Sequence, residues 1–167
     1  FFYLSLSNTV GGAIFHDGNL LPGDAFRCGE AGHMTLIPDG KPCYCGKTGC
    51  VDAYCSARLL SDLSGGRLED FFLGLQQNNP DYRSVWDTYL KHLAVVINNL
   101  HMLLDYDIVL GGYVEVFTPW LDTIRHLVAE RNTFEDDGSF VKLCTYQTGA
   151  AAYGAAMDVM EGFLRTV

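Results

Sequence analysis

Positive charge is scarce in this chain of 167 residues. Its 11 Lys and Arg residues face 20 Asp and Glu residues, so the formal net charge is −9. Binding to DNA or RNA depends on neutralising phosphates with cations, so we expect no nucleic-acid contact by this chain itself. The sequence has no apolar run of the roughly 20 residues that a membrane-spanning helix needs, and no secretory signal pattern. These absences predict a cytoplasmic protein with no membrane partner.

The chain has too few cysteines for a disulfide-rich scaffold, and their spacing does not suit a disulfide framework. Six cysteines occur in the chain, and three of them, Cys43, Cys45 and Cys50, fall in one stretch rich in glycine and proline. The single residue between the first two makes a mutual disulfide awkward. His33 precedes this group, and one imidazole with three thiolates completes a closed tetrahedral zinc site. We predict that these four residues hold a structural zinc ion in loop 33–50; buried small residues or disulfide partners are the alternative.

Apolar strands that alternate with helical stripes predict a mixed α/β fold. Asp17-Gly18 is a hairpin signal between two short strands. Asn79-Pro80 opens the strongest helix, because asparagine caps helices and proline suits their first position. The predicted strands are 2–7, 13–16, 34–37, 108–110 and 141–144, and the predicted helices are 51–60, 80–104, 118–131 and one that opens at 149.

Two acidic residues flank the candidate metal loop. Glu30 lies three residues before His33, and Asp52 lies two residues after Cys50. If the loop closes around a metal, both carboxylates come near the imidazole, and such a set can bind the neighbouring hydroxyls of a sugar. Capping of a turn or helix, with exposure to solvent, is the simpler explanation of both acids, and spacing alone favours it.

Gly111-Gly112 follows the predicted strand 108–110. In open α/β sheets, ligands gather beyond the carboxyl ends of the strands, where glycines let the backbone approach a phosphate or ribose. A tight turn between strand and helix explains the same two glycines. The pair is therefore a weak candidate for a nucleotide contact.

Several segments together resemble the signature of the ROK family (repressors, open reading frames and kinases). They are Gly-Glu-Ala-Gly-His-Met at 29–34, Pro-Asp-Gly at 38–40 and Cys-Tyr-Cys-Gly-Lys-Thr-Gly-Cys at 43–50. Residues 108–112 and 149–156 are similar to the nucleotide-side segments of that family. The resemblance implies an actin/hexokinase-like ATPase fold, related to ribonuclease H, with residues 1–167 as its carboxyl-terminal lobe.

The resemblance also implies roles for single residues. It supports the four zinc ligands, and it favours Glu30 and His33 as contacts to the hydroxyls of a hexose or an N-acetylhexosamine. Asp52 stands where the family usually has glutamate; because its side chain is one methylene shorter, the sugar contact becomes water-mediated or the sugar preference shifts. Tyr113 stands where the family has a third glycine, and its bulk makes ATP binding doubtful.

The family contains both sugar kinases and sugar-responsive regulators. Kinases of the family carry an Asp-x-Gly-Gly-Thr phosphate loop and a catalytic aspartate in an amino-terminal lobe; neither is in this sequence, so we assign no catalytic residue. Residues 3–8, Arg27 before Cys28, and Cys55 resemble the NagC/XylR-like regulators. We expect the sugar-sensing lobe of a homo-oligomeric regulator, dimer or tetramer, that reaches DNA only through an amino-terminal domain outside this chain. A sugar kinase of the glucokinase or N-acetylhexosamine kinase type is the alternative, and a zinc-stapled interaction module without a small ligand is another.

Overall fold

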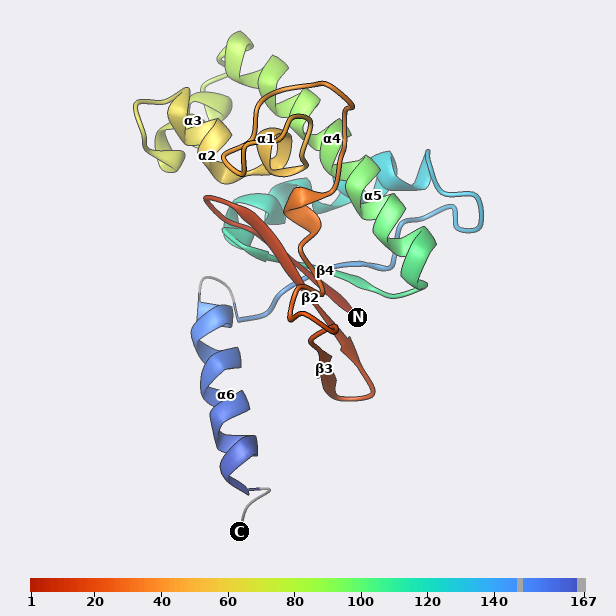
Figure 1. Ribbon diagram of the computed structural model, residues 1–167. Coiled ribbons are helices and arrows are strands. Elements are labelled where there is room, and N and C mark those ends of the chain that lie inside the picture. Colours follow the sequence, from red (N-terminus) through yellow and green to blue (C-terminus); the bar gives the residue numbers. More distant parts are fainter. Residues whose placement is uncertain (147–148, 165–167) are drawn as a thin grey trace.

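A mixed five-stranded sheet organises the chain, whose computed structural model describes residues 1–146 and 149–164 (Figure 1). The strand order is β3-β2-β1-β4-β5; β1 pairs with β2 antiparallel and with β4 parallel. The central strand β1 buries every second side chain against the helices, as a half-covered strand does. The strands are β1 (Phe2–Leu6), β2 (Val10–His16), β3 (Asn19–Leu21), β4 (Ile108–Gly112) and β5 (Val141–Leu143).

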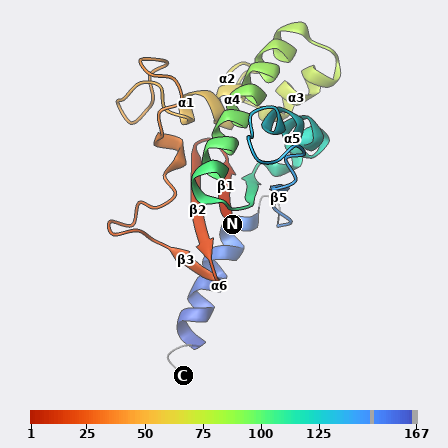
Figure 2. The same cartoon turned by 90° about the vertical axis from the view of Figure 1, so that its right-hand side faces the viewer.

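Helices α1 to α5 group together on one side of the sheet, and α6 extends away from them in both views (Figures 1 and 2). The described part of the chain contains no helix that is both long and apolar enough to cross a membrane. The helices are η1 (Ala31–His33), α1 (Asp52–Cys55), α2 (Ala57–Asp62), α3 (Leu68–Gln76), α4 (Pro80–Leu104), η2 (Val114–Trp120), α5 (Leu121–Ala129) and α6 (Ala150–Leu164).

Helix α4 is the centre of the apolar core, as its stripe predicts. Asn79 caps it by accepting hydrogen bonds from the backbone N–H groups of Asp81 and Tyr82, at 3.0 and 3.2 Å. Trp86 is fully buried and lies between the rings of Phe71 and Phe117. Those two phenylalanines therefore belong to the main core.

Two predicted elements are wrong in the first half of the chain. The segment 34–37 is not a strand; it contributes only an isolated bridge between Thr35 and Cys50. The helix predicted over 51–60 is two helices, because Ser56 is extended with φ −75° and ψ 148°. The N–H of Ala57 donates to the carbonyl of Ser7 at 2.8 Å, which ties this break to the end of β1.

Several further boundaries differ from the prediction, and one helix was not predicted. Strand β2 begins at Val10 rather than 13, since the ring of Phe2 packs where Gly12 has no side chain. The helix expected over 118–131 begins earlier, as the 3₁₀ segment η2, and α5 covers only Leu121–Ala129. Helix α3 was not predicted; it covers only the nine residues Leu68–Gln76, and it contains Gly74, which lowers helix propensity.

Candidate functional site

Two short stretches of backbone pairing fold residues 33–50 into the candidate metal loop. Thr35 bridges to Cys50, and Pro42 bridges to Thr48. The first bridge returns the end of the loop to the segment that follows His33. The second bridge closes a tight turn that contains Cys43 and Cys45. The local pairing therefore brings residues up to 17 positions apart to one point, as the zinc prediction requires.

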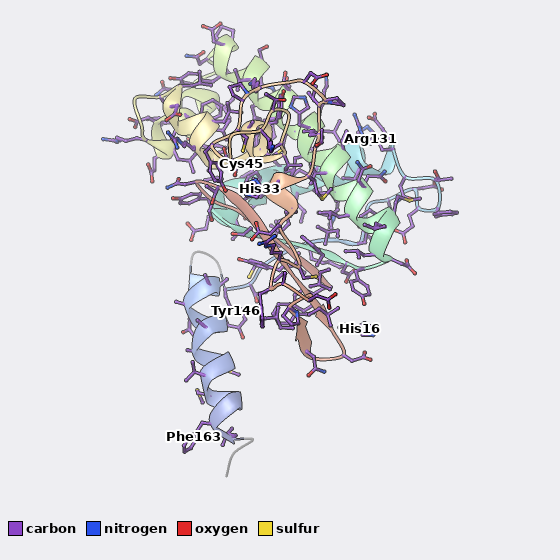
Figure 3. The ribbon with its side chains drawn as sticks, viewed as in Figure 1. His16, His33, Cys45, Arg131, Tyr146 and Phe163 are labelled. Atoms are coloured by element: carbon purple, nitrogen blue, oxygen red, sulfur yellow. The ribbon has the colours of Figure 1, made fainter. Side chains whose placement is uncertain are left out.

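The side chains of His33, Cys43, Cys45 and Cys50 form a cluster in which all four ligand atoms lie within 4.8 Å of one another. The Sγ atoms of the last two are 3.8 Å apart. Sulfur atoms bound tetrahedrally to zinc at about 2.3 Å are separated by about 3.8 Å, so the spacing fits this metal. Figure 3 shows His33 and Cys45 close together above the sheet. The donor set is closed, as in a structural site.

The thiols of the cluster do not ionise independently in the protein without metal. Burial, together with hydrogen bonds from Cys45 and Cys43, raises the pKa of Cys50 to about 11. A hydrogen bond from the backbone of Lys47 lowers the pKa of Cys45. The thiol of Cys45 therefore becomes negatively charged more readily than the thiol of Cys50. A divalent cation would have to displace protons from this cluster, which couples metal binding to pH.

Tyr44 joins the site, although sequence reasoning did not identify it. Its hydroxyl lies 3.2 Å from Nε2 of His33, and the two rings meet edge to face with centroids 5.4 Å apart. Desolvation and then the charge of Asp52 raise the pKa of Tyr44, and the charge of Glu30 adds to the shift. Both predicted acids therefore lie within electrostatic reach of the Tyr44 hydroxyl. The only feature of the sequence that could have pointed to Tyr44 is its position between the predicted ligands Cys43 and Cys45.

Val10 anchors both ends of the loop to strand β2. Its N–H donates to Oδ1 of Asp52 at 2.6 Å, and the Asp52 side chain is buried at the start of α1. On the other side, a Cβ at Gly32 would overlap the carbonyl oxygen of Val10, so only glycine allows η1 to lie this close. Asp52 thus has a structural role whatever else it binds, whereas Glu30 is exposed beside η1.

The two glycines at the end of β4 are required by packing. A Cβ at Gly111 would overlap the ring of Tyr3. Gly112 has φ +80°, and a Cβ there would meet the carbonyl of Leu6. Tyr113 itself has φ −77°, so the backbone at this position does not require a glycine. Its hydroxyl donates to Oδ1 of Asn8 at 3.4 Å, across the end of the sheet.

Comparison with known proteins agrees with this geometry. The ROK family profile matches residues 1–161. Among curated proteins, the N-acetylmannosamine kinase of Salmonella typhi is 28% identical over 163 residues, which is 93% of this chain and 55% of that protein. The chain thus spans about half the length of the curated relatives it matches.

Two solved structures share the fold. A ROK family glucokinase from Streptomyces griseus, in complex with glucose and AMPPNP, superposes with a TM-score of 0.74 at 20% identity, covering 89% of this chain and 56% of that one. A ROK family transcriptional regulator, a homologue of the E. coli MLC protein, gives a TM-score of 0.66 at 23% identity, covering 85% and 40%. Kinases and regulators therefore share this architecture.

Proposed function

The chain belongs to the ROK family, and from that membership we propose that it is the sugar-binding lobe of a kinase for an N-acetylhexosamine. Its mixed α/β fold is the actin-like ATPase lobe of the family, and its His/Cys cluster is consistent with the family's zinc site. The name of the Salmonella relative supports a kinase better than the regulator expected from the sequence. The phosphate loop and catalytic base of such a kinase would lie outside this chain.

The contact between Tyr44 and His33 is the observation that carries the sugar-binding proposal. The Tyr44 hydroxyl already lies within hydrogen-bonding distance of Nε2 of His33. This nitrogen therefore faces a position that a hydroxyl group can occupy. The exposed carboxylate of Glu30 acts on the same hydroxyl electrostatically. A sugar with two neighbouring hydroxyls would place them on these two side chains, and a hydrogen bond to a charged group contributes roughly 1.5–3 kcal/mol.

Asp52 has a secondary role in this proposal. One of its carboxylate oxygens accepts from the N–H of Val10, which leaves the other for a water or a hydroxyl. Zinc, when bound, would fix the ring orientation and tautomer of His33. The residues of this chain then hold and orient the sugar, and no residue of the chain is assigned to phosphoryl transfer.

A transcriptional regulator is the second candidate, and Tyr113 favours it. The Tyr113 side chain reaches over the end of β4 to Asn8, beside the glycines that the family uses on its nucleotide side. A protein that never binds ATP tolerates a bulky ring there. In a regulator, sugar binding would shift an equilibrium between two arrangements of a dimer or tetramer, and an amino-terminal domain would contact DNA.

The test uses the full-length protein that contains this chain. We expect ATP-dependent phosphorylation of N-acetylmannosamine, measured as ADP release across a panel with N-acetylglucosamine and glucose. Sugar binding without ADP release, together with DNA binding, would show that the protein is a regulator and not a kinase. If calorimetry detects no binding of any of these sugars, the sugar site itself is wrong.

A further inference from the structure

Tyr44 makes a contact that a bound sugar could not tolerate unchanged. Its hydroxyl lies 3.2 Å from Nε2 of His33. The backbone of Tyr44 is held between the metal ligands Cys43 and Cys45, but its side chain is 62% exposed. A side chain held in this way can change rotamer toward solvent while the loop keeps its shape.

The hydrogen-bonding capacity of an imidazole makes the contact exclusive. With Nε2 facing Tyr44, Nδ1 of His33 is the nitrogen left for the thiol cluster. A neutral imidazole whose Nδ1 binds a metal keeps its proton on Nε2, which then donates one hydrogen bond in the ring plane. In the zinc-loaded protein, the phenol oxygen of Tyr44 would accept that bond. A sugar oxygen that reaches Nε2 must accept the same proton.

We propose that Tyr44 is a specificity-determining residue that occupies the sugar-hydroxyl position on His33 and swings away when a sugar binds. The inference rests on the proposed function, because it takes His33 as a sugar contact. A sugar oxygen gains its bond from His33 only by replacing the bond that His33 donates to Tyr44. The sugar hydroxyl on His33 therefore contributes less net affinity than the hydroxyl on Glu30. Tyr44 therefore lowers affinity for the complete sugar without affecting an analogue that lacks the hydroxyl for His33.

The experiment compares Tyr44→Phe with the parent in the full-length zinc-loaded protein, by calorimetric titration with N-acetylmannosamine and its monodeoxy analogues. Phenylalanine keeps the ring against His33 but cannot accept the proton. We expect affinity for the complete sugar to rise about three- to tenfold, the net worth of one neutral hydrogen bond. The gain should vanish for the one deoxy analogue whose missing hydroxyl is the partner of His33.

Tyr146→Phe is the matched control, because the Tyr146 side chain is also 62% exposed and lies outside the loop. It should leave every affinity unchanged, and all three proteins should hold the same amount of zinc. The ¹⁵N chemical shift of His33 Nε2 without sugar should change in Tyr44→Phe alone.

The outcomes separate the two proposals. If the parent binds the sugar and Glu30→Gln weakens it, but Tyr44→Phe binds no more tightly than the parent, the role of Tyr44 is wrong and the sugar site stands. A gain that persists for every deoxy analogue also overturns it. If neither the parent nor Tyr44→Phe binds any sugar of the panel, both proposals fail.

Discussion

The metal loop and the end of strand β4 are both glycine-rich, yet they differ in what their glycines leave free. Just before the loop, Gly32 brings η1 against β2, and the side chains of Glu30 and His33 remain exposed. At the strand end, Gly111 and Gly112 pack closely against Tyr3 and Leu6 of the same sheet, which leaves no room for a side chain at either position. In this chain the glycine before the loop leaves donor side chains exposed for a ligand, whereas the glycines at the strand end are packed against the neighbouring strand β1.

The largest expected effect breaks the loop. Cys43→Ser removes a buried thiol of the candidate zinc cluster, and we expect the zinc content to fall from about one ion per chain to nearly none. The unfolding temperature should drop by about 10 °C, which corresponds to a loss of about 2.5–5 kcal/mol, since 1 kcal/mol shifts it by about 2–4 °C in a chain of this size. Elemental analysis and calorimetry measure both quantities.

Cys28→Ser is the control for that variant, because Cys28 lies outside the cluster and is partly exposed. It should keep both the zinc and the unfolding temperature. A Cys43→Ser protein that retains its zinc would mean that the cluster does not bind metal as assigned.

The next largest effect concerns the packing of Gly111 at the end of strand β4. Gly111→Ala should lower the free energy of unfolding by about 1–3 kcal/mol, because its Cβ overlaps the ring of Tyr3. The double variant Tyr3→Leu with Gly111→Ala should recover part of that loss in chemical denaturation. If Gly111→Ala is as stable as the parent but loses affinity for ATP, the glycine serves a nucleotide and the contrast between the two regions fails.

A smaller effect concerns the pH dependence of zinc affinity. Because the pKa of Cys50 is raised to about 11, this thiol is protonated near neutral pH in the metal-free protein and must release its proton on binding. Zinc affinity should therefore rise with pH, by about tenfold per pH unit for each proton released. Competition with a chelator of known affinity between pH 6.5 and 7.5 measures the slope. A slope of zero would show that the thiols are already ionised.

The parts of this picture that depend on local patterns could be predicted from the sequence. Spacing predicted the cluster of His33, Cys43, Cys45 and Cys50, and the apolar period predicted α4. The remainder depends on contacts between residues far apart in the chain. The bond from Val10 to Asp52 spans 42 positions, and the break at Ser56 is tied to the backbone of Ser7. No local pattern encodes either contact, and Tyr44 has no periodic signal at all.

The central claim of the proposal is that the sugar binds beside the metal loop, at Glu30 and His33, and that the end of strand β4 takes no part in sugar binding. Glu30→Gln and Glu115→Gln make the same chemical change at exposed positions of the two regions, since Glu115 lies just after Tyr113. In calorimetric titration of the full-length protein with N-acetylmannosamine, Glu30→Gln should weaken binding by about tenfold or more, because a charge-assisted bond is lost. Glu115→Gln should bind as the parent does. Unchanged affinity in Glu30→Gln, with a loss in Glu115→Gln, would contradict the assignment.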